Sequence, residues 1–256
     1  MRRFLQRIYQ SNIAIKLRNF IGYKIIKVNL KNMEKDFSVS DTFLWRTDNN
    51  FKTIISYSDI LHQFFELEFS IIYIYIFDNK NKLLKVIENK DPKNLNKFII
   101  DKNLLDNHEG YGTFFIFHNN QNKVDASIRN SCYTGFSKND NMPSFVHGNL
   151  MGASSPINNG KNILKYGIME TSLFKNNTYK IQKSFLSYEN IELFISNPTN
   201  RKIHFAANNK EHYLGIGESK IIEFNKINTI TIKSNCFILR PIAFVYKNKY
   251  LDVFHC

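Results

Sequence analysis

The chain has 256 residues, of which 43% are hydrophobic and 22% are charged, as in an ordinary globular protein. This composition excludes a disordered chain, a collagen-like fibre and a small disulfide-rich domain. Thirty-five Lys and Arg residues against 22 Asp and Glu residues give a formal net charge of +13. A chain of this length buries most of its apolar surface in one or two domains.

The positive charge is concentrated at the N-terminus. Residues 1–33 contain eight Lys and Arg residues and no Asp or Glu, so they carry +8 of the +13. A nucleic-acid-binding protein normally spreads its basic residues over a folded surface, so nucleic acid is not an expected partner. We expect residues 1–33 to form a basic arm whose field attracts anionic partners.

The spacing of apolar residues in this arm predicts two short helices. The second follows Ser11, a natural N-cap, places Ile13, Leu17 and Phe20 on one face, and ends at Gly22. Three interpretations of the arm stay open. It lies on an anionic membrane surface, it docks on a partner or a second copy in an oligomer, or it packs on the rest of its own chain.

After residue 40, short aromatic and β-branched runs alternate with clusters of Asn, Asp, Gly and Lys. This alternation predicts strands and favours a mainly β fold, an antiparallel β-sandwich or two similar sandwiches in tandem, with a short N-terminal helical arm. Residues 58–65 suit a short helix. The expected strands are 42–46, 51–57, 71–77, 83–87, 98–100, 112–118, 180–186, 191–195, 202–206, 220–224, 229–233, 242–246 and 250–254.

A weak internal similarity indicates a duplication. Residues 42–46 and the strand after them resemble residues 171–175 and the strand after those, at an offset of about 130. We therefore expect three parts: the basic helical arm (1–33), a sandwich half with a long functional loop (34–165), and a second sandwich half (166–256).

The expected binding site is the loop from about residue 108 to residue 149. Between residues 119 and 164 the strand pattern thins, yet aromatic residues argue against disorder. An Arg side chain offers a planar fork for a carboxylate or phosphate, while aromatic faces and amides suit sugar rings. The hypothesis is an accessory binding protein, not an enzyme and without a cofactor, that recognises a carbohydrate or glycan precursor through Arg129, Asn130, Tyr133, Phe145, His147 and Asn149.

Two alternatives stay open. His and Glu side chains in the same region could ligate Zn, Fe or Mn, as in a cupin-like metal-dependent enzyme, although the His-x-His pattern of cupins is absent. The candidate ligands are His108, Glu109, His118 and His147. The second alternative is a structural or assembly β protein with no small ligand.

Other motifs are missing from the sequence. It has no phosphate loop, dinucleotide-binding glycine pattern, nucleophile elbow or zinc-protease motif, which lowers the expectation of those enzymes. Cys132, Cys236 and Cys256 lie far apart, so we expect free thiols in a reducing compartment. No signal-peptide core precedes Gly22, and the longest apolar run, 71–77, is far shorter than a membrane helix. We expect a soluble cytoplasmic protein, peripheral at the inner face of a membrane if the arm binds lipid.

Overall fold

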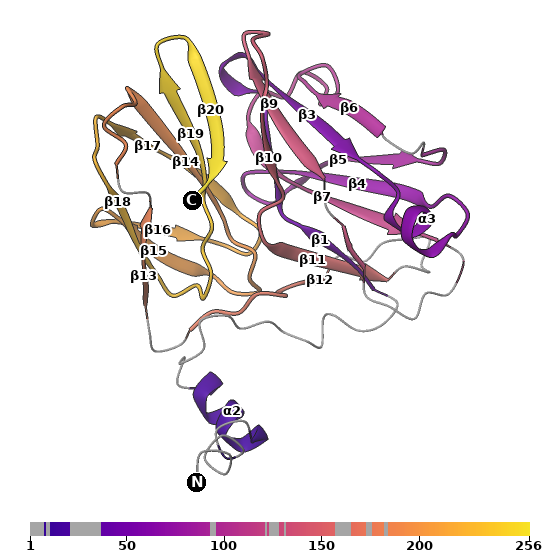
Figure 1. The fold of residues 1–256 in the computed structure, drawn as a ribbon, viewed down its shortest axis with the longest axis horizontal. Helices are drawn as coiled ribbons and strands as arrows, with labels where there is room; N and C mark the ends of the chain where they lie inside the picture. Colours follow the sequence, from indigo (N-terminus) through magenta and orange to yellow (C-terminus); the bar gives the residue numbers. More distant parts are fainter. Residues whose placement is uncertain are drawn as a thin grey trace.

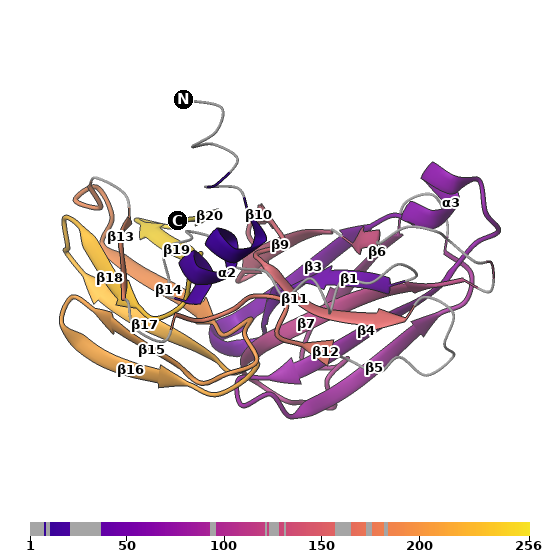
Figure 2. The same cartoon turned by 90° about the horizontal axis from the view of Figure 1, so that it is seen from below.

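The computed structural model describes residues 8, 11–20, 37–92, 96–120, 122, 128–130, 132–156, 165–172, 176–181 and 184–256. It confirms the mainly β fold: the described strands form five four-stranded sheets. These sheets gather into two lobes that lie side by side (Figures 1 and 2). We call residues 37–166 the N-terminal lobe and residues 177–256 the C-terminal lobe. Most of residues 1–36 lie outside the described residues. The first predicted helix, apart from Ile8, and the predicted helix end at Gly22 are among the residues left out.

The N-terminal lobe is built on two sheets, with strand orders β2-β7-β4-β5 and β10-β9-β3-β6. Trp45, Ile74 and Ile116 of the first sheet and Ile55 of the second belong to one buried apolar cluster. The strands are β2 (Phe43–Arg46), β3 (Phe51–Tyr57), β4 (Ile71–Asp78), β5 (Leu83–Asn89), β6 (Asn96–Ile100), β7 (Tyr111–Asn119), β9 (Tyr133–Lys138) and β10 (Ser144–His147).

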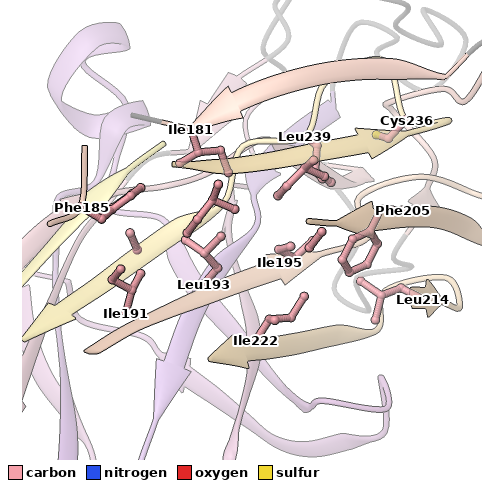
Figure 3. Close-up of a cluster of buried hydrophobic side chains, with 14 of the residues drawn as sticks. Ile181, Phe185, Ile191, Leu193, Ile195, Phe205, Leu214, Ile222, Cys236 and Leu239 are labelled. Carbon is pink, nitrogen blue, oxygen red and sulfur yellow. The ribbon is translucent and has the colours of Figure 1, made fainter. Parts of the chain in front are cut away.

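The C-terminal lobe is a second two-sheet sandwich, with strand orders β13-β18-β15-β16 and β17-β14-β19-β20. Its core contains Ile191, Leu193, Phe205 and Ile222, whose side chains Figure 3 shows between the strands. The strands are β13 (Asn177–Ile181), β14 (Asn190–Ser196), β15 (Ile203–Ala207), β16 (Lys210–Leu214), β17 (Ser219–Asn225), β18 (Ile230–Ser234), β19 (Ile242–Lys247) and β20 (Tyr250–His255).

The two lobes share one strand order. If the eight strands of each are numbered along the chain, one sheet in both has the order first-sixth-third-fourth, and the other joins the fifth, second, seventh and eighth. The internal match seen in the sequence differs from this correspondence, because β2 corresponds to β13 and not to residues 171–175. A tandem duplication would produce this shared order; the duplication itself stays a prediction.

The N-terminal lobe carries an additional sheet that the sequence did not predict. β1 (Phe37–Asp41), β8 (Ile128–Asn130), β11 (Met151–Pro156) and β12 (Lys165–Tyr166) form it, with β8 parallel to β1. It covers β7, whose Phe115 and Phe117 pack with Ala153 of β11. The segment between residues 119 and 164 is therefore not the long loop that we expected, because β8 to β11 lie within it; its part in binding stays a prediction. β8, β11 and β12 show no clear alternation of apolar residues, and the alternation in β1 involves only Phe37 and Val39.

A separate apolar cluster joins the lobes. Phe51 of β3 and Phe136 of β9 pack with Phe194 of β14 and Phe244 of β19, and Phe244 meets both Phe51 and Phe136 edge-on. β14 and β19 alternate, so Leu193 and Ala243 face the core of their own lobe while Phe194 and Phe244 face the other lobe. Such a buried apolar contact fixes the relative position of the lobes.

Asparagine occupies most of the turn positions that have a left-handed backbone conformation. Among the described residues, twelve non-glycine residues have a positive φ, and eight of them are Asn. Asn tolerates the left-handed region better than most residues, because its short amide can bond to the nearby backbone. The abundant Asn thus has a structural use, and two of these residues, Asn139 and Asn248, lie at hairpin tips that become important below.

The expected short helix is present as α3 (Ile60–Phe65), and one buried carboxylate organises it. Asp59 caps α3 by accepting hydrogen bonds from the N–H groups of Leu61 and His62. The same carboxylate accepts from the N–H and hydroxyl of Ser70 and from Nδ1 of His118, at 2.6, 2.9 and 3.1 Å. Burial alone would raise the pKa of Asp59, but the hydrogen bonds from His118 and Ser70 lower it to about 2.

In the arm, the structure confirms the second predicted helix as α2 (Asn12–Phe20), with Ser11 as its cap: the Ser11 hydroxyl accepts a hydrogen bond from the N–H of Ala14. No helix among the described residues has the length and apolar character needed to cross a bilayer.

Replacing Asp59 should destabilise the fold. Asp59→Ala removes the cap of α3 and leaves the donors of Ser70 and His118 buried without an acceptor, so the free energy of unfolding should fall by about 2–4 kcal/mol. Urea titration followed by circular dichroism measures this change. Asp140→Asn, which removes the charge of an exposed partner of Lys52 and suits the positive φ at this position, is the control and should leave the midpoint unchanged.

The lowered pKa of Asp59 also predicts a dependence on acid. Because its folded pKa of about 2 lies below the ordinary value of 3.8, Asp59 stabilises the fold fully above about pH 4 and loses this contribution as the pH falls toward 2. Between these pH values the wild type should lose on the order of 2 kcal/mol more than Asp59→Ala does. The free energies of unfolding come from urea titrations at each pH. An equal loss in the wild type and in Asp59→Ala between about pH 4 and about pH 2 would refute this assignment.

Candidate functional site

A buried arginine lies at the contact between the lobes. Arg46, at the end of β2, is 1% exposed. Its guanidinium donates two hydrogen bonds to Asp48, at 2.9 and 2.8 Å, and one at 2.5 Å to Glu192 of β14 in the other lobe. The same group lies over the rings of Phe51 and Phe244, 4.2 and 4.8 Å from their centroids. Charge, hydrogen bonding and aromatic packing therefore hold the two lobes at one point.

Glu192 is the counterpart of Arg46 in the C-terminal lobe. It also accepts a 2.6 Å hydrogen bond from the hydroxyl of Tyr246. Burial would raise the pKa of Glu192, but the hydrogen bond and charge of Arg46, together with the Tyr246 hydroxyl, lower it. Burial and the neighbouring Glu192 raise the pKa of Tyr246. The carboxylate therefore stays charged and the phenol stays a donor at neutral pH.

Beside this contact is a cleft of about 930 Å³ between the hairpins β9–β10 and β19–β20. Lys138, Asn139 and residues 141–144 contribute one side, and Tyr246 and residues 248–251 contribute the other. These hairpins occupy equivalent positions in the shared strand order, and their tips lie at the same end of the molecule (Figure 1). The volume lies in the range of small-molecule sites in proteins.

The cleft combines aromatic, amide and cationic side chains. Its aromatic groups are Tyr246 and Tyr250, and Tyr250 is 79% exposed. The ammonium of Lys138 lies 4.7 Å from the ring centroid of Tyr246, so a cation also bridges the lobes beside the cleft. Three amides and a second lysine complete its polar lining: Asn139, Asn141, Asn248 and Lys249.

Hydrogen bonds join the two hairpins along their facing edges. The Ser144 hydroxyl on β10 donates to Asp252 and accepts from the N–H of Val253, both on β20. Nε2 of His255 donates to the carbonyl oxygen of His147, at 3.0 Å. Burial and the charge of nearby Arg240 lower the pKa of His255 to about 4, so this ring is neutral at physiological pH. The cleft is thus bounded by hairpins held at a fixed separation.

Three of the predicted ligand-binding residues share one surface. Tyr133 and His147 are paired across β9 and β10, their ring centroids are 4.5 Å apart, and Phe145 lies two residues from His147 on the same face. All three side chains are exposed. None of them lines the cleft, which begins at the neighbouring Ser144. Their part in binding stays a prediction.

Of the other three predicted residues, Arg129 and Asn130 have structural partners, and Asn149 is buried. Arg129 donates two hydrogen bonds to Asp41, at 2.8 and 2.9 Å, although half of its side chain is exposed. Asn130 is fully buried and donates to the hydroxyl of Ser38, and Asn149 is also buried. Burial keeps both amides from a ligand at the surface, so the prediction is corrected for Asn130 and Asn149.

The predicted metal site is not assembled. His108 and His118 flank opposite ends of the nine-residue β7, which separates them by roughly 25–30 Å. His118 is buried beside Asp59, Glu109 pairs with Lys102, and His147 lies against Tyr133 on another sheet. Within the described part of the chain, no group of three or more His, Cys, Asp or Glu side chains could hold a metal ion. The four residues therefore do not form the cupin-like centre. All three cysteines are free, as expected, with Cys132 and Cys236 buried.

Sequence reasoning missed the half of the cleft that the C-terminal lobe contributes. Both strands of the β19–β20 hairpin were predicted, but nothing marked Tyr246, Asn248 and Tyr250 as site residues. One available signal was the pair of Asn-rich turns, at 139–141 and at 248, each between two strands.

Comparisons with known proteins identify no family. No protein-family model matches the sequence, and no curated protein matches it. A solved structure titled "The structure of a beta-glucuronidase from glycoside hydrolase family 2" aligns with 10% sequence identity and a TM-score of 0.19. The alignment covers 88% of this chain and 26% of that one. So low a score carries no argument about fold or function.

The contact between Arg46 and Glu192 can be tested by a double-mutant cycle. Arg46→Met leaves the Glu192 carboxylate buried without its cation and should reduce the free energy of unfolding by about 3–5 kcal/mol. Adding Glu192→Leu removes the unpaired charge, so the double variant should lose less than the sum of the single losses. Fluorescence of Trp45, the one tryptophan, reports urea unfolding. Strict additivity would contradict the pairing, and the exposed pair Lys102 and Glu109 gives the matched control cycle.

Proposed function

We propose that the protein binds carbohydrate, without cleaving it, in the cleft between the β9–β10 and β19–β20 hairpins. The observation that carries this proposal is the exposed Tyr250 ring in a cleft of about 930 Å³ whose lining also contains three amides, Asn139, Asn141 and Asn248.

Sugar chemistry suits this lining. One face of a pyranose ring consists of C–H groups and packs on an aromatic ring, while the hydroxyls around its edge need donors and acceptors. Tyr250 supplies an aromatic surface, and each of Asn139, Asn141 and Asn248 supplies both a donor and an acceptor. The positive φ of Asn139 and Asn248 fixes the backbone at both tips, which reduces the entropy lost on binding.

The same lining favours binding over hydrolysis. Glycoside cleavage normally needs two carboxyl groups on either side of the scissile bond. None of the described residues that line the cleft is Asp, Glu, His or Cys. The proposal therefore places the protein among accessory binding proteins.

A second concavity, of about 480 Å³, supports the proposal less well. It adjoins the cleft at Asn139 and contains Lys52, Asp101, Lys102 and Asp140. Lys52 and Asp140 already form an ion pair at 2.7 Å, and this hollow has no exposed aromatic side chain.

A glycan array, followed by calorimetric titration of the selected glycan, tests the function. Tyr250→Ala should weaken binding about tenfold, because it removes the exposed stacking surface from one wall of the cleft. Tyr213→Ala is the matched control, since Tyr213 is 59% exposed on β16 of the same lobe and does not line the cleft. Its affinity should equal that of the wild type.

Two results would contradict the proposal. An array without any specific glycan would leave a structural or assembly protein as the better account. Equal affinities of the wild type and Tyr250→Ala for the glycan would show that the glycan binds outside the cleft. Tyr133→Ala, on the outward face of β9–β10, would then be the next variant to measure.

A further inference from the structure

We propose that α2 is a docking helix that lies on anionic lipid membranes. The inference is independent of the carbohydrate site, because α2 and the cleft share no residue. It rests on two observations: the exposure of the apolar side chains of α2, and the charge of the segment that contains it.

Two aliphatic side chains of α2, Ile13 and Leu17, face water. Ile13 is 82% exposed and Leu17 is 61% exposed. They are four residues apart and therefore share one side of the helix. Just before the helix, Ile8 is 50% exposed. Figure 1 shows α2 apart from the sheets of both lobes, so neither sandwich core takes up this face.

The charge of the segment is one-sided. Residues 1–33 contain eight basic residues and no acidic one, and Lys16 within α2 is exposed. Each Lys or Arg near an anionic bilayer strengthens binding, and these contributions add to those of inserted apolar side chains. An anionic lipid surface complements both features: its headgroups attract the basic side chains, and its hydrocarbon takes up the exposed aliphatic groups.

Other occupants match less of this chemistry. A second copy of the chain would bring another +8 segment against the first, and like charges oppose such a contact. Nucleic acid would satisfy the basic side chains but offers Ile13 and Leu17 no apolar environment. The nine residues of α2 span about 14 Å, less than half the hydrocarbon thickness of a bilayer, so the helix lies along the surface.

Vesicle co-sedimentation of the full chain tests the proposal. The probes are phosphatidylcholine vesicles and vesicles that also contain phosphatidylserine. The protein should sediment with the anionic vesicles only, and salt should release it, because screening weakens the attraction. Ile13→Ala and Leu17→Ala should each reduce the partition coefficient about tenfold by removing inserted apolar surface. Alanine is the best helix former, so these losses cannot come from melting of α2.

The matched control is Phe64→Ala on α3. Phe64 is 75% exposed, and its replacement also removes exposed apolar surface without changing the charge. Its binding should equal that of the wild type.

Three results would overturn the proposal: equal sedimentation with neutral and anionic vesicles, binding unchanged by Ile13→Ala and Leu17→Ala, or loss of binding in Phe64→Ala alone. Analytical ultracentrifugation tests the remaining alternative, a contact between two copies of the chain. A dimer that Leu17→Ala abolishes, together with the absence of vesicle binding, would assign the helix to a second copy and refute the lipid assignment.

Discussion

Arg46 brings a full positive charge into the contact between the two lobes, where water is excluded. Such a charge is tolerated only with partners, and it has Asp48 on its own lobe and Glu192 on the other. If the lobes separated or rotated, Glu192 would lose its cation and Phe51 would lose Phe244. Together with the apolar cluster beside it, this contact therefore fixes how the two sandwiches sit together. Everything formed jointly by both lobes depends on it.

The cleft is the main consequence. Each of its sides is a hairpin that the lobe needs for its own sheet, so no special insertion forms it. It exists because equivalent hairpins of two sandwiches with the same strand order come to lie together. Tyr246 belongs both to the contact between the lobes and to the cleft. Its hydroxyl donates a hydrogen bond to Glu192, and the residue also lines the cleft. Binding and lobe packing therefore share a residue, which explains why Tyr250, and not Tyr246, is the informative position for a binding variant.

Sequence patterns predicted what depends on local periodicity. The strand over residues 51–57 coincides with β3, because Phe51, Thr53, Ile55 and Tyr57 alternate strictly with outward side chains. The additional sheet was missed because β8 and β11 are short and polar, and their burial comes from covering β7. The pairing of Arg46 with Glu192 spans 146 positions and leaves no local signal. Three of the predicted residues, Tyr133, Phe145 and His147, lie on the β9–β10 hairpin but do not line the cleft, because one sequence segment could not reveal the second hairpin opposite it.

NMR shift mapping distinguishes carbohydrate binding in the interlobe cleft from binding at any other surface. Backbone amide spectra of the isotope-labelled protein would be recorded with and without the glycan selected by the array. The account predicts shifts concentrated in residues 138–144 and 246–251, on both hairpins at once. Shifts confined to Tyr133, Phe145 and His147, or to a surface of one lobe alone, would contradict it.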